Sequence, residues 1–196
     1  MLFLSLLLAH LLADFVLQSD ALVVWKHKSW KGVFVHAFIH FLTMAALLWR
    51  YAGNGLVVAV LAAVAMSHYW LDGFKITHEK RGKDYVKLFF QDQISHVVVL
   101  VLASLALWNV VAVPVSFGFV DYFQNPFVVL YLIFAVLLTY CYEIVSFQYK
   151  RQHKPHERMK LDFVTMFLRL LVFTLAYGLV IILSSYQIAQ TFNGLQ

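Results

Sequence analysis

The stretch LLLAHLLADFVLQSD, residues 6–20, has the character of a membrane helix that carries ionisable side chains in its apolar run. His10 and Asp14 lie four residues apart in this stretch. On insertion scales an ionised group in the middle of a membrane helix costs about 2.5–3.5 kcal/mol. We therefore predict that other parts of the chain, or a bound cation, offset the free-energy cost of burying this pair.

The composition predicts that the whole chain is embedded in a membrane. Of its 196 residues, 62% are hydrophobic and only 13% are charged, and the mean hydropathy is +0.77. A soluble domain of this length needs a more polar surface. The expected fold class is therefore all-α, a polytopic membrane helix bundle.

Six apolar stretches approach the roughly 20 residues that a helix needs to cross the hydrocarbon layer. They lie at 1–18, 33–50, 55–75, 91–113, 127–148 and 161–186. The first lacks the positively charged start and the small-residue cleavage site of a signal peptide, so we expect it in the mature protein. We predict one integral membrane domain over 1–196, with a four-helix half at 1–113 and a two-helix scaffold half at 114–196.

The basic residues predict the orientation, because thirteen of the fifteen fall in alternate loops. These thirteen are Lys26, Lys28, Lys31, Lys75, Lys80, Arg81, Lys83, Lys87, Lys150, Arg151, Lys154, Arg158 and Lys160. By the positive-inside rule their loops are cytoplasmic, and both termini lie outside the cytoplasm. The basic, aromatic-containing loops also favour contact with anionic lipid headgroups beside the bilayer. Nucleic acid is not an expected partner, because no binding motif is present.

Ionisable residues recur as pairs in each of the first four apolar stretches. The pairs are His10 and Asp14, His36 and His40, His68 and Asp72, and Asp92 and His96. A spacing of four residues places both members on one face of a helix. With the alternating direction of the helices, all eight groups fall in the cytoplasmic halves. We therefore expect the four helices to surround one site.

The order within the pairs predicts two layers. The layer nearer the cytoplasm holds Asp14, His36, Asp72 and Asp92, and the deeper layer holds His10, His40, His68 and His96. Corresponding residues of the first and second helix pairs are separated by 56 to 58 positions. This offset predicts a parallel repeat of two helical hairpins.

Imidazole and carboxylate groups without thiolates are typical ligands of transition metals. Paired ligands on facing helices are also how bundles build di-metal sites. We predict that all eight residues bind one or two divalent ions, zinc in the first place with manganese or iron as alternatives. One of Asp14, Asp72 and Asp92 would remain free to act as a general base.

Three further polar residues lie near the predicted ligands, namely Gln18, Gln93 and Lys75. Each is placed to orient a ligand or to hold a phosphate oxygen, although all three are close enough to the interface to reach water instead. Farther along the chain, Glu143 and Arg169 lie at similar depth in the last two helices. We expect these two to form a buried ion pair.

Four stretches carry a resemblance to a known family: AHLLADFVLQSD, HAFIHF, SHYWLDGFK and FFQDQISH. They resemble the motifs of a bacterial multi-pass inner-membrane family known as a domain of unknown function. The likeness covers roughly the first 110 residues. More distantly, the His/Asp pairs are similar to those of the membrane-bound metal-dependent hydrolases. The resemblance implies a location in the bacterial inner membrane.

Three functions fit these observations. In the first, the protein is a metal-dependent hydrolase that acts near the cytoplasmic interface on a lipid-like or phosphorylated lipid substrate. In the second, the same His/Asp cluster conducts a cation or protons, and in the third it is a structural polar core without activity. The outer halves of the first four helices contain almost no ionisable residues, which favours a one-sided site over a transport pathway.

Overall fold

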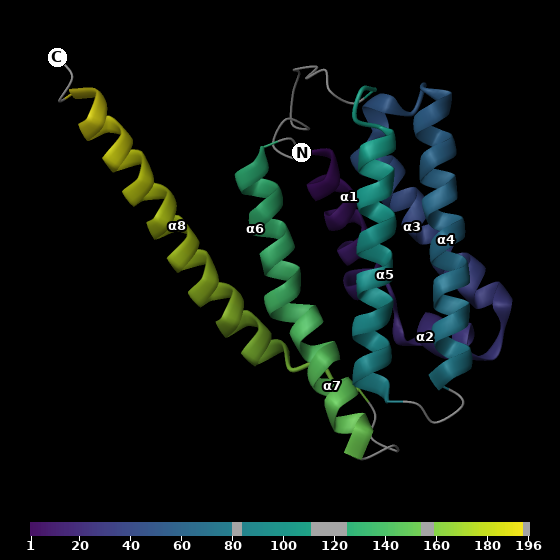
Figure 1. Ribbon diagram of the computed structural model, residues 1–196. Helices are drawn as coiled ribbons and strands as arrows, with labels where there is room; N and C mark the ends of the chain where they lie inside the picture. The colour runs from purple at the N-terminus through teal and green to yellow at the C-terminus, as the bar shows by residue number, and fades with distance from the viewer. Residues whose placement is uncertain (80–83, 111–124, 154–158, 194–196) are drawn as a thin grey trace.

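The computed structural model describes residues 1–79, 84–110, 125–153 and 159–193, with side chains through residue 185 of the last helix. Within these ranges every regular element is a helix (Figure 1), which confirms the all-α prediction. The α-helices are α1 (Leu2–Leu11), α2 (Asp20–Lys28), α3 (Trp30–Leu47), α4 (Gly55–Glu79), α5 (Tyr85–Ala106), α6 (Pro126–Val136), α7 (Tyr142–His153) and α8 (Phe163–Asn193). Two π-helical turns, η1 (Leu12–Val16) and η4 (Leu137–Cys141), and a 3-10 turn, η2 (Trp49–Tyr51), complete them.

Five helical stretches are long and apolar enough to cross a membrane, which identifies the chain as a membrane protein. They are Trp30–Leu47, Gly55–Glu79, Tyr85–Ala106, Pro126–His153 and Phe163–Ser185. A sixth candidate is the pair Leu2–Val16 and Asp20–Lys28, which is bent by 89° at its break. The prediction of about six spans therefore holds, with the first span shorter than expected and followed by a sharp turn.

Helix α1 is the central element of the bundle. It packs against α3, α5 and α6, and α4 closes the bundle between α3 and α5 (Figure 1). The start of α1 and the end of α8 lie at one end of the molecule, and α2 lies at the other. We call the end formed by α2, the last turn of α4, the first turn of α5 and α7 the basic end. The described basic residues of the three predicted cytoplasmic loops gather there, whereas Lys80, Arg81, Lys83, Lys154 and Arg158 lie outside the described residues.

The half of the bundle opposite the basic end is filled by apolar side chains. Buried residues of α1, α3, α4 and α5 form one continuous cluster, which contains Leu6, Ala9, Met44, Leu48, Val57, Leu61, Val64, Ala65, Leu100, Ala103 and Leu107. Within a bilayer, close van der Waals packing of these side chains contributes to holding the helices together at this end. The polar residues are thereby confined to the other half.

The π-helical turn η1 shapes the central helix where its polar residues lie. The amide of Leu17 donates to the carbonyl of Leu12 at 2.9 Å, a five-residue step in place of the four-residue step of an α-helix. Asp14 lies inside this turn, and η1 contacts the second π turn, η4, on the neighbouring span. Because π turns inside α-helices frequently occur at functional sites, the location of Asp14 in η1 makes it a candidate functional residue.

The expectation that residues 19–32 form a loop is wrong, because α2 occupies most of this segment. Ser19 caps α2 by accepting a hydrogen bond from Leu22 N at 3.3 Å. Ser29 caps the following helix by accepting from Lys31 N at 3.2 Å. Such serine caps satisfy amides that a helix start leaves unpaired. Two caps ten residues apart thus produce a short helix, which lies across the basic end.

Helix α2 packs closely against α3 through Gly32. A Cβ added to Gly32 would lie 2.6 Å from both Lys26 N and Trp25 C, which are backbone atoms. No side chain at residue 32 fits unless α2 moves. The lack of a side chain here therefore sets the position of α2.

The outer helix α8 leans away from the bundle and contacts α6 along part of its length (Figure 1). Asp162 caps it by accepting a hydrogen bond from Thr165 N at 3.2 Å, and this bond lowers the pKa of the Asp162 carboxyl. Tyr131 and Thr174 share a hydrogen bond of 2.9 Å between the two helices. Glu143 and Arg169 form the predicted ion pair, but both side chains are only partly buried.

We expect Gly32→Ala to lower the free energy of unfolding by about 1–3 kcal/mol, as overpacking typically does, because backbone rather than side-chain atoms obstruct the new methyl group. Gly53→Ala is the matched control, since its added Cβ meets no atom within 4 Å. The measurement is equilibrium unfolding of the detergent-solubilised protein. Equal unfolding midpoints for the two variants would contradict the tight contact between α2 and α3.

Candidate metal centre

The structure brings the eight predicted residues together in one buried cluster. Each is at most 8% exposed. They come from α1 and η1 (His10, Asp14), α3 (His36, His40), α4 (His68, Asp72) and α5 (Asp92, His96). The predicted convergence of four helices on one site is therefore confirmed, while the role of these residues as metal ligands stays a prediction.

The four histidines of the deeper layer contact one another directly. The ring centroids of His40 and His68 are 3.6 Å apart, and those of His68 and His96 are 4.1 Å apart. His10 lies 5.1 to 5.7 Å from the other three rings. The fifth ring, His36, lies 4.8 Å from His40 and 5.0 Å from His68.

Asp14 is the carboxylate around which the histidines gather. His36 Nε2 and His40 Nε2 each lie 3.0 Å from Asp14 Oδ1. His68 Nε2 is 3.7 Å from the same oxygen, and His10 Nε2 is 3.5 Å from Oδ2. One carboxylate therefore joins side chains from α1, α3 and α4. Because a carboxylate only accepts hydrogen bonds, its close neighbours His36 and His40 donate through Nε2–H.

The other two aspartates are paired with lysines. Lys26 Nζ donates to Asp72 Oδ2 at 2.8 Å, and Lys75 Nζ donates to Asp92 Oδ2 at 2.8 Å. Lys26 is only 8% exposed. The carboxylates at the basic side of the cluster are thus compensated by ammonium groups, in keeping with the high cost of an unpaired buried charge.

The donor atoms are spaced as transition-metal ligands are. Three groups have one ligand atom from each member within 4.8 Å of the others: His10, Asp14, His40 and His68; His36, His68 and Asp72; and Asp72, Asp92 and His96. In a tetrahedral zinc site, bonds of 2.0–2.2 Å place the ligand atoms about 3.4 Å apart. The contacts of Asp14 with histidine nitrogens span 3.0 to 3.7 Å.

Several ligand-type atoms in the cluster have no hydrogen-bond partner among the described residues. These atoms are His36 Nδ1, His68 Nε2, Asp92 Oδ1, and both ring nitrogens of His96. Buried polar atoms in folded proteins are usually hydrogen-bonded. A metal ion would satisfy such nitrogens and oxygens directly, so the donor set fits a transition metal.

The three residues predicted near the ligands behave differently. Gln93 is central, because its Nε2 donates to Asp14 Oδ2 at 3.1 Å and its Oε1 lies 3.3 Å from His10 Nε2. Lys75 binds Asp92. Gln18 instead donates to the backbone carbonyl of Asp14 at 3.2 Å, so it stabilises the turn and does not touch the carboxylate.

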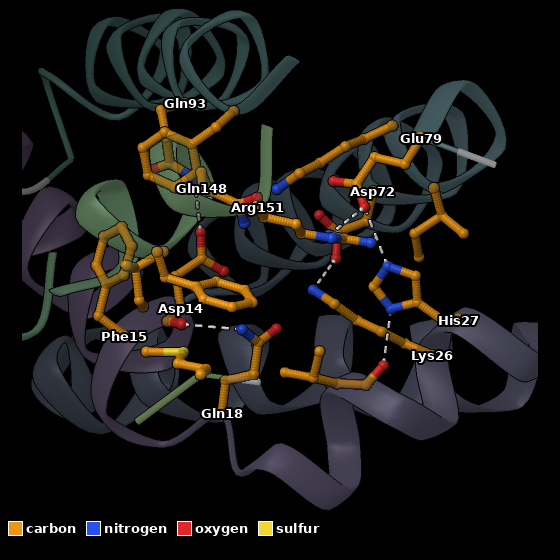
Figure 2. A pocket seen from close by; sticks show the side chains of 17 residues that line it. Asp14, Phe15, Gln18, Lys26, His27, Asp72, Glu79, Gln93, Gln148 and Arg151 are labelled. Carbon is orange, nitrogen blue, oxygen red and sulfur yellow. Dashed lines mark hydrogen bonds and ion pairs between the residues drawn. The ribbon is translucent and has the colours of Figure 1, made fainter. Parts of the chain in front are cut away.

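A cavity of about 110 Å³ lies between the cluster and the basic end (Figure 2). Its lining includes Asp14 and Asp72 from the cluster, Lys26 and His27 from α2, and Gln148 and Arg151 from α7. The cavity therefore connects the carboxylates of the cluster with side chains of the second half of the chain.

Sequence reasoning missed Lys26, His27, Glu79 and Arg151 as parts of this site. Glu79 is 6% exposed and lies 3.2 Å from His27 Nε2 and 3.4 Å from Arg151 Nη1. Lys26 and Arg151 were assigned to loops on their charge alone. The signal that could have found Lys26 and His27 is the helical cap at Ser19, because it turns the loop into a helix with an inward face.

The fold and the cluster together define a polytopic helical membrane protein with a buried His/Asp centre near one end. The chain belongs to the family described as Protein of unknown function (DUF3307), whose model matches residues 2–123. All eight residues of the cluster lie within this match. No curated protein and no solved structure matches the chain.

We expect Asp14→Asn to lower the free energy of unfolding by about 1.5–3 kcal/mol, because the charged partner of two buried imidazole N–H groups is lost. Asp20→Asn, at the exposed start of α2, is the matched control and should unfold like the wild type. Denaturant titration of both proteins in the same detergent measures the difference. An unchanged midpoint for Asp14→Asn would show that Asp14 does not hold the cluster together.

Proposed function

We propose that the protein is a metal-dependent hydrolase of the membrane, with one or two divalent transition-metal ions, zinc foremost, held by the His/Asp cluster. The substrate is a lipid-like molecule, and the bond cleaved is an ester or phosphoester. A bound divalent ion would supply an activated water and polarise the oxygen of the scissile group. The distant likeness to membrane-bound metal-dependent hydrolases supports this proposal.

The observation that carries the proposal is that, among the described residues, the cavity that reaches Asp14 and Asp72 lies on the side of the basic end. Apolar side chains fill the bundle beyond the deeper histidines, whereas the cavity on the other side reaches Asp14 and Asp72. A hydrolase needs one opening for water and substrate. A cation or proton transporter needs polar access to both sides of the membrane, so the apolar half favours hydrolysis.

Among the three aspartates, Asp92 is the best candidate for the general base. Both oxygens of Asp14 face nitrogen donors, and Asp72 is bound by the deeply buried Lys26. Asp92 Oδ1 has no hydrogen-bond partner among the described residues. A carboxylate oxygen in that state is available to accept a proton from water.

A groove between α4 and α5 supports a lipid-like substrate. Its volume is about 720 Å³, and it reaches Asp92 and Lys75. The apolar part of its wall includes Leu71, Phe74 and Ile94, which are partly or largely exposed on the surface of the bundle. Charged side chains line the groove at the basic end. An amphipathic groove beside the cluster suits a molecule that approaches from the bilayer.

We expect wild-type protein to carry about one or two ions per chain by elemental analysis. His40→Ala and Asp72→Ala, one from each layer, should both be depleted of metal, because an incomplete ligand set leaves the other buried groups uncompensated. Wild-type protein should cleave a phospholipid or lipid-phosphate analogue, and a chelator should abolish the activity.

The alternatives give different results in the same experiments. Wild-type protein that is free of metal, and takes up no zinc, manganese or iron when these are added, would leave the cluster as a proton relay or a structural polar core. Protein that carries metal and cleaves nothing, but moves cations across liposomes, would identify a transporter.

We also propose that the protein lies in the bacterial inner membrane, with its basic end in the cytoplasm and both termini outside. The positive-inside rule supports this orientation. The start of α1 and the end of α8 both lie on the side opposite α2 (Figure 1).

Cysteine labelling of intact cells measures this orientation. In a Cys141→Ala background, a cysteine at Asn54 should react with an impermeant maleimide, and one at Lys28 should not. Both positions are exposed and lie at opposite ends of the bundle. The reverse pattern would place the basic end outside.

A further inference from the structure

The cavity beside the cluster is lined by the carboxylates of Asp14, Asp72 and Glu79 and by several basic side chains. Three basic side chains enter it from two helices, Lys26 and His27 from α2 and Arg151 from α7 (Figure 2). Lys75 reaches it from α4 and also lines the groove between α4 and α5. Ammonium and guanidinium groups that converge on one small space are the usual means of binding phosphate oxygens.

Charge balance shows why an anion is needed when metal is bound. Four carboxylates (Asp14, Asp72, Asp92 and Glu79) face four basic side chains (Lys26, His27, Lys75 and Arg151) through the contacts given above. Since the carboxylates outnumber the lysine and arginine side chains by only one, a bound divalent ion would leave this buried site with a net positive charge. Such a site favours an anion.

The size of the cavity limits what the anion can be. Pockets that enclose a whole drug-sized molecule measure about 300–1,000 Å³, whereas this cavity measures about 110 Å³. It suits a single tetrahedral oxyanion and not an entire lipid.

We propose that this cavity binds the phosphate group of the substrate, with Arg151 and Lys26 as its principal donors, and so places a phosphomonoester beside the His/Asp cluster. This inference rests on the proposed function, and it names the substrate class. Arg151 makes a long contact of 3.4 Å from Nη1 to Glu79 Oε2. Its guanidinium carries five N–H groups, which can bind phosphate oxygens in pairs.

The test uses isothermal titration calorimetry to measure phosphate binding to metal-loaded, detergent-purified full-length protein. The probes are inorganic phosphate, dioctanoyl phosphatidic acid and the uncharged dioctanoylglycerol. We expect the two phosphate probes to bind and the uncharged lipid not to bind. Stronger binding of phosphatidic acid than of inorganic phosphate would identify a lipid headgroup as the source, and equal binding would identify a free or water-soluble phosphate.

Matched variants connect the binding to the cavity. Arg151→Gln should weaken phosphate binding about tenfold or more, the loss expected for one charge-assisted hydrogen bond. Arg151→Lys should fall between this variant and the wild type, because it keeps the charge but loses the paired donors. Lys150→Gln is the control, since Lys150 is exposed and does not line the cavity. Equal binding by Arg151→Gln and Lys150→Gln would overturn the assignment.

Metal content, measured on the same samples, separates this inference from the proposed function. Protein that carries metal but binds neither phosphate probe overturns the phosphate site and leaves the metal centre standing. Protein that binds phosphate through Arg151 but holds no metal supports the phosphate site and overturns the hydrolase proposal.

Discussion

The arrangement of the bundle depends on the burial of one carboxylate, Asp14. An ionised aspartate inside a membrane protein requires nearby donors, and here they come from side chains on α1, α3, α4 and α5. These helices cannot move apart without exposing Asp14 to an apolar environment. Interactions between apolar side chains are weak determinants of helix order in a bilayer, because lipid tails are equally apolar. The polar cluster thus determines which helices are neighbours.

Two features of the backbone position the charged groups of the cluster. The π turn η1 changes the helical step after His10, and the close approach of α2 to Gly32 brings Lys26 to the carboxylate of Asp72. The first is a distortion within the central helix, and the second is a contact between two consecutive helices. Each of them sets the position of a charged group in the polar half of the bundle.

The helices and the cluster could be predicted because both follow from simple periodicities. Long apolar runs give membrane helices, and a four-residue spacing in four such runs gives a common face. Lys26 and Glu79 could not be found in this way, because their roles come from the fold of the segments that connect the spans. The positive-inside rule already explains a lysine near a membrane span, so the charge of Lys26 alone does not indicate a second role. The π turn was equally invisible, since no residue type marks the extra step at Leu12–Val16.

The central position of α1 has a consequence for the biogenesis of the protein. This helix is synthesised before the other described helices, and the partners of Asp14 on α3 and α5 follow Asp14 by 22 to 79 residues. At a synthesis rate of about 5–20 residues per second, the last of them appears roughly 4–16 s later. Until these partners are made, the carboxylate of Asp14 has no compensating donors from α3 and α5, and an unpaired ionised group is costly in the membrane. The stable insertion of α1 therefore depends on helices not yet made, and assembly of the bundle must proceed from the later helices back to the first.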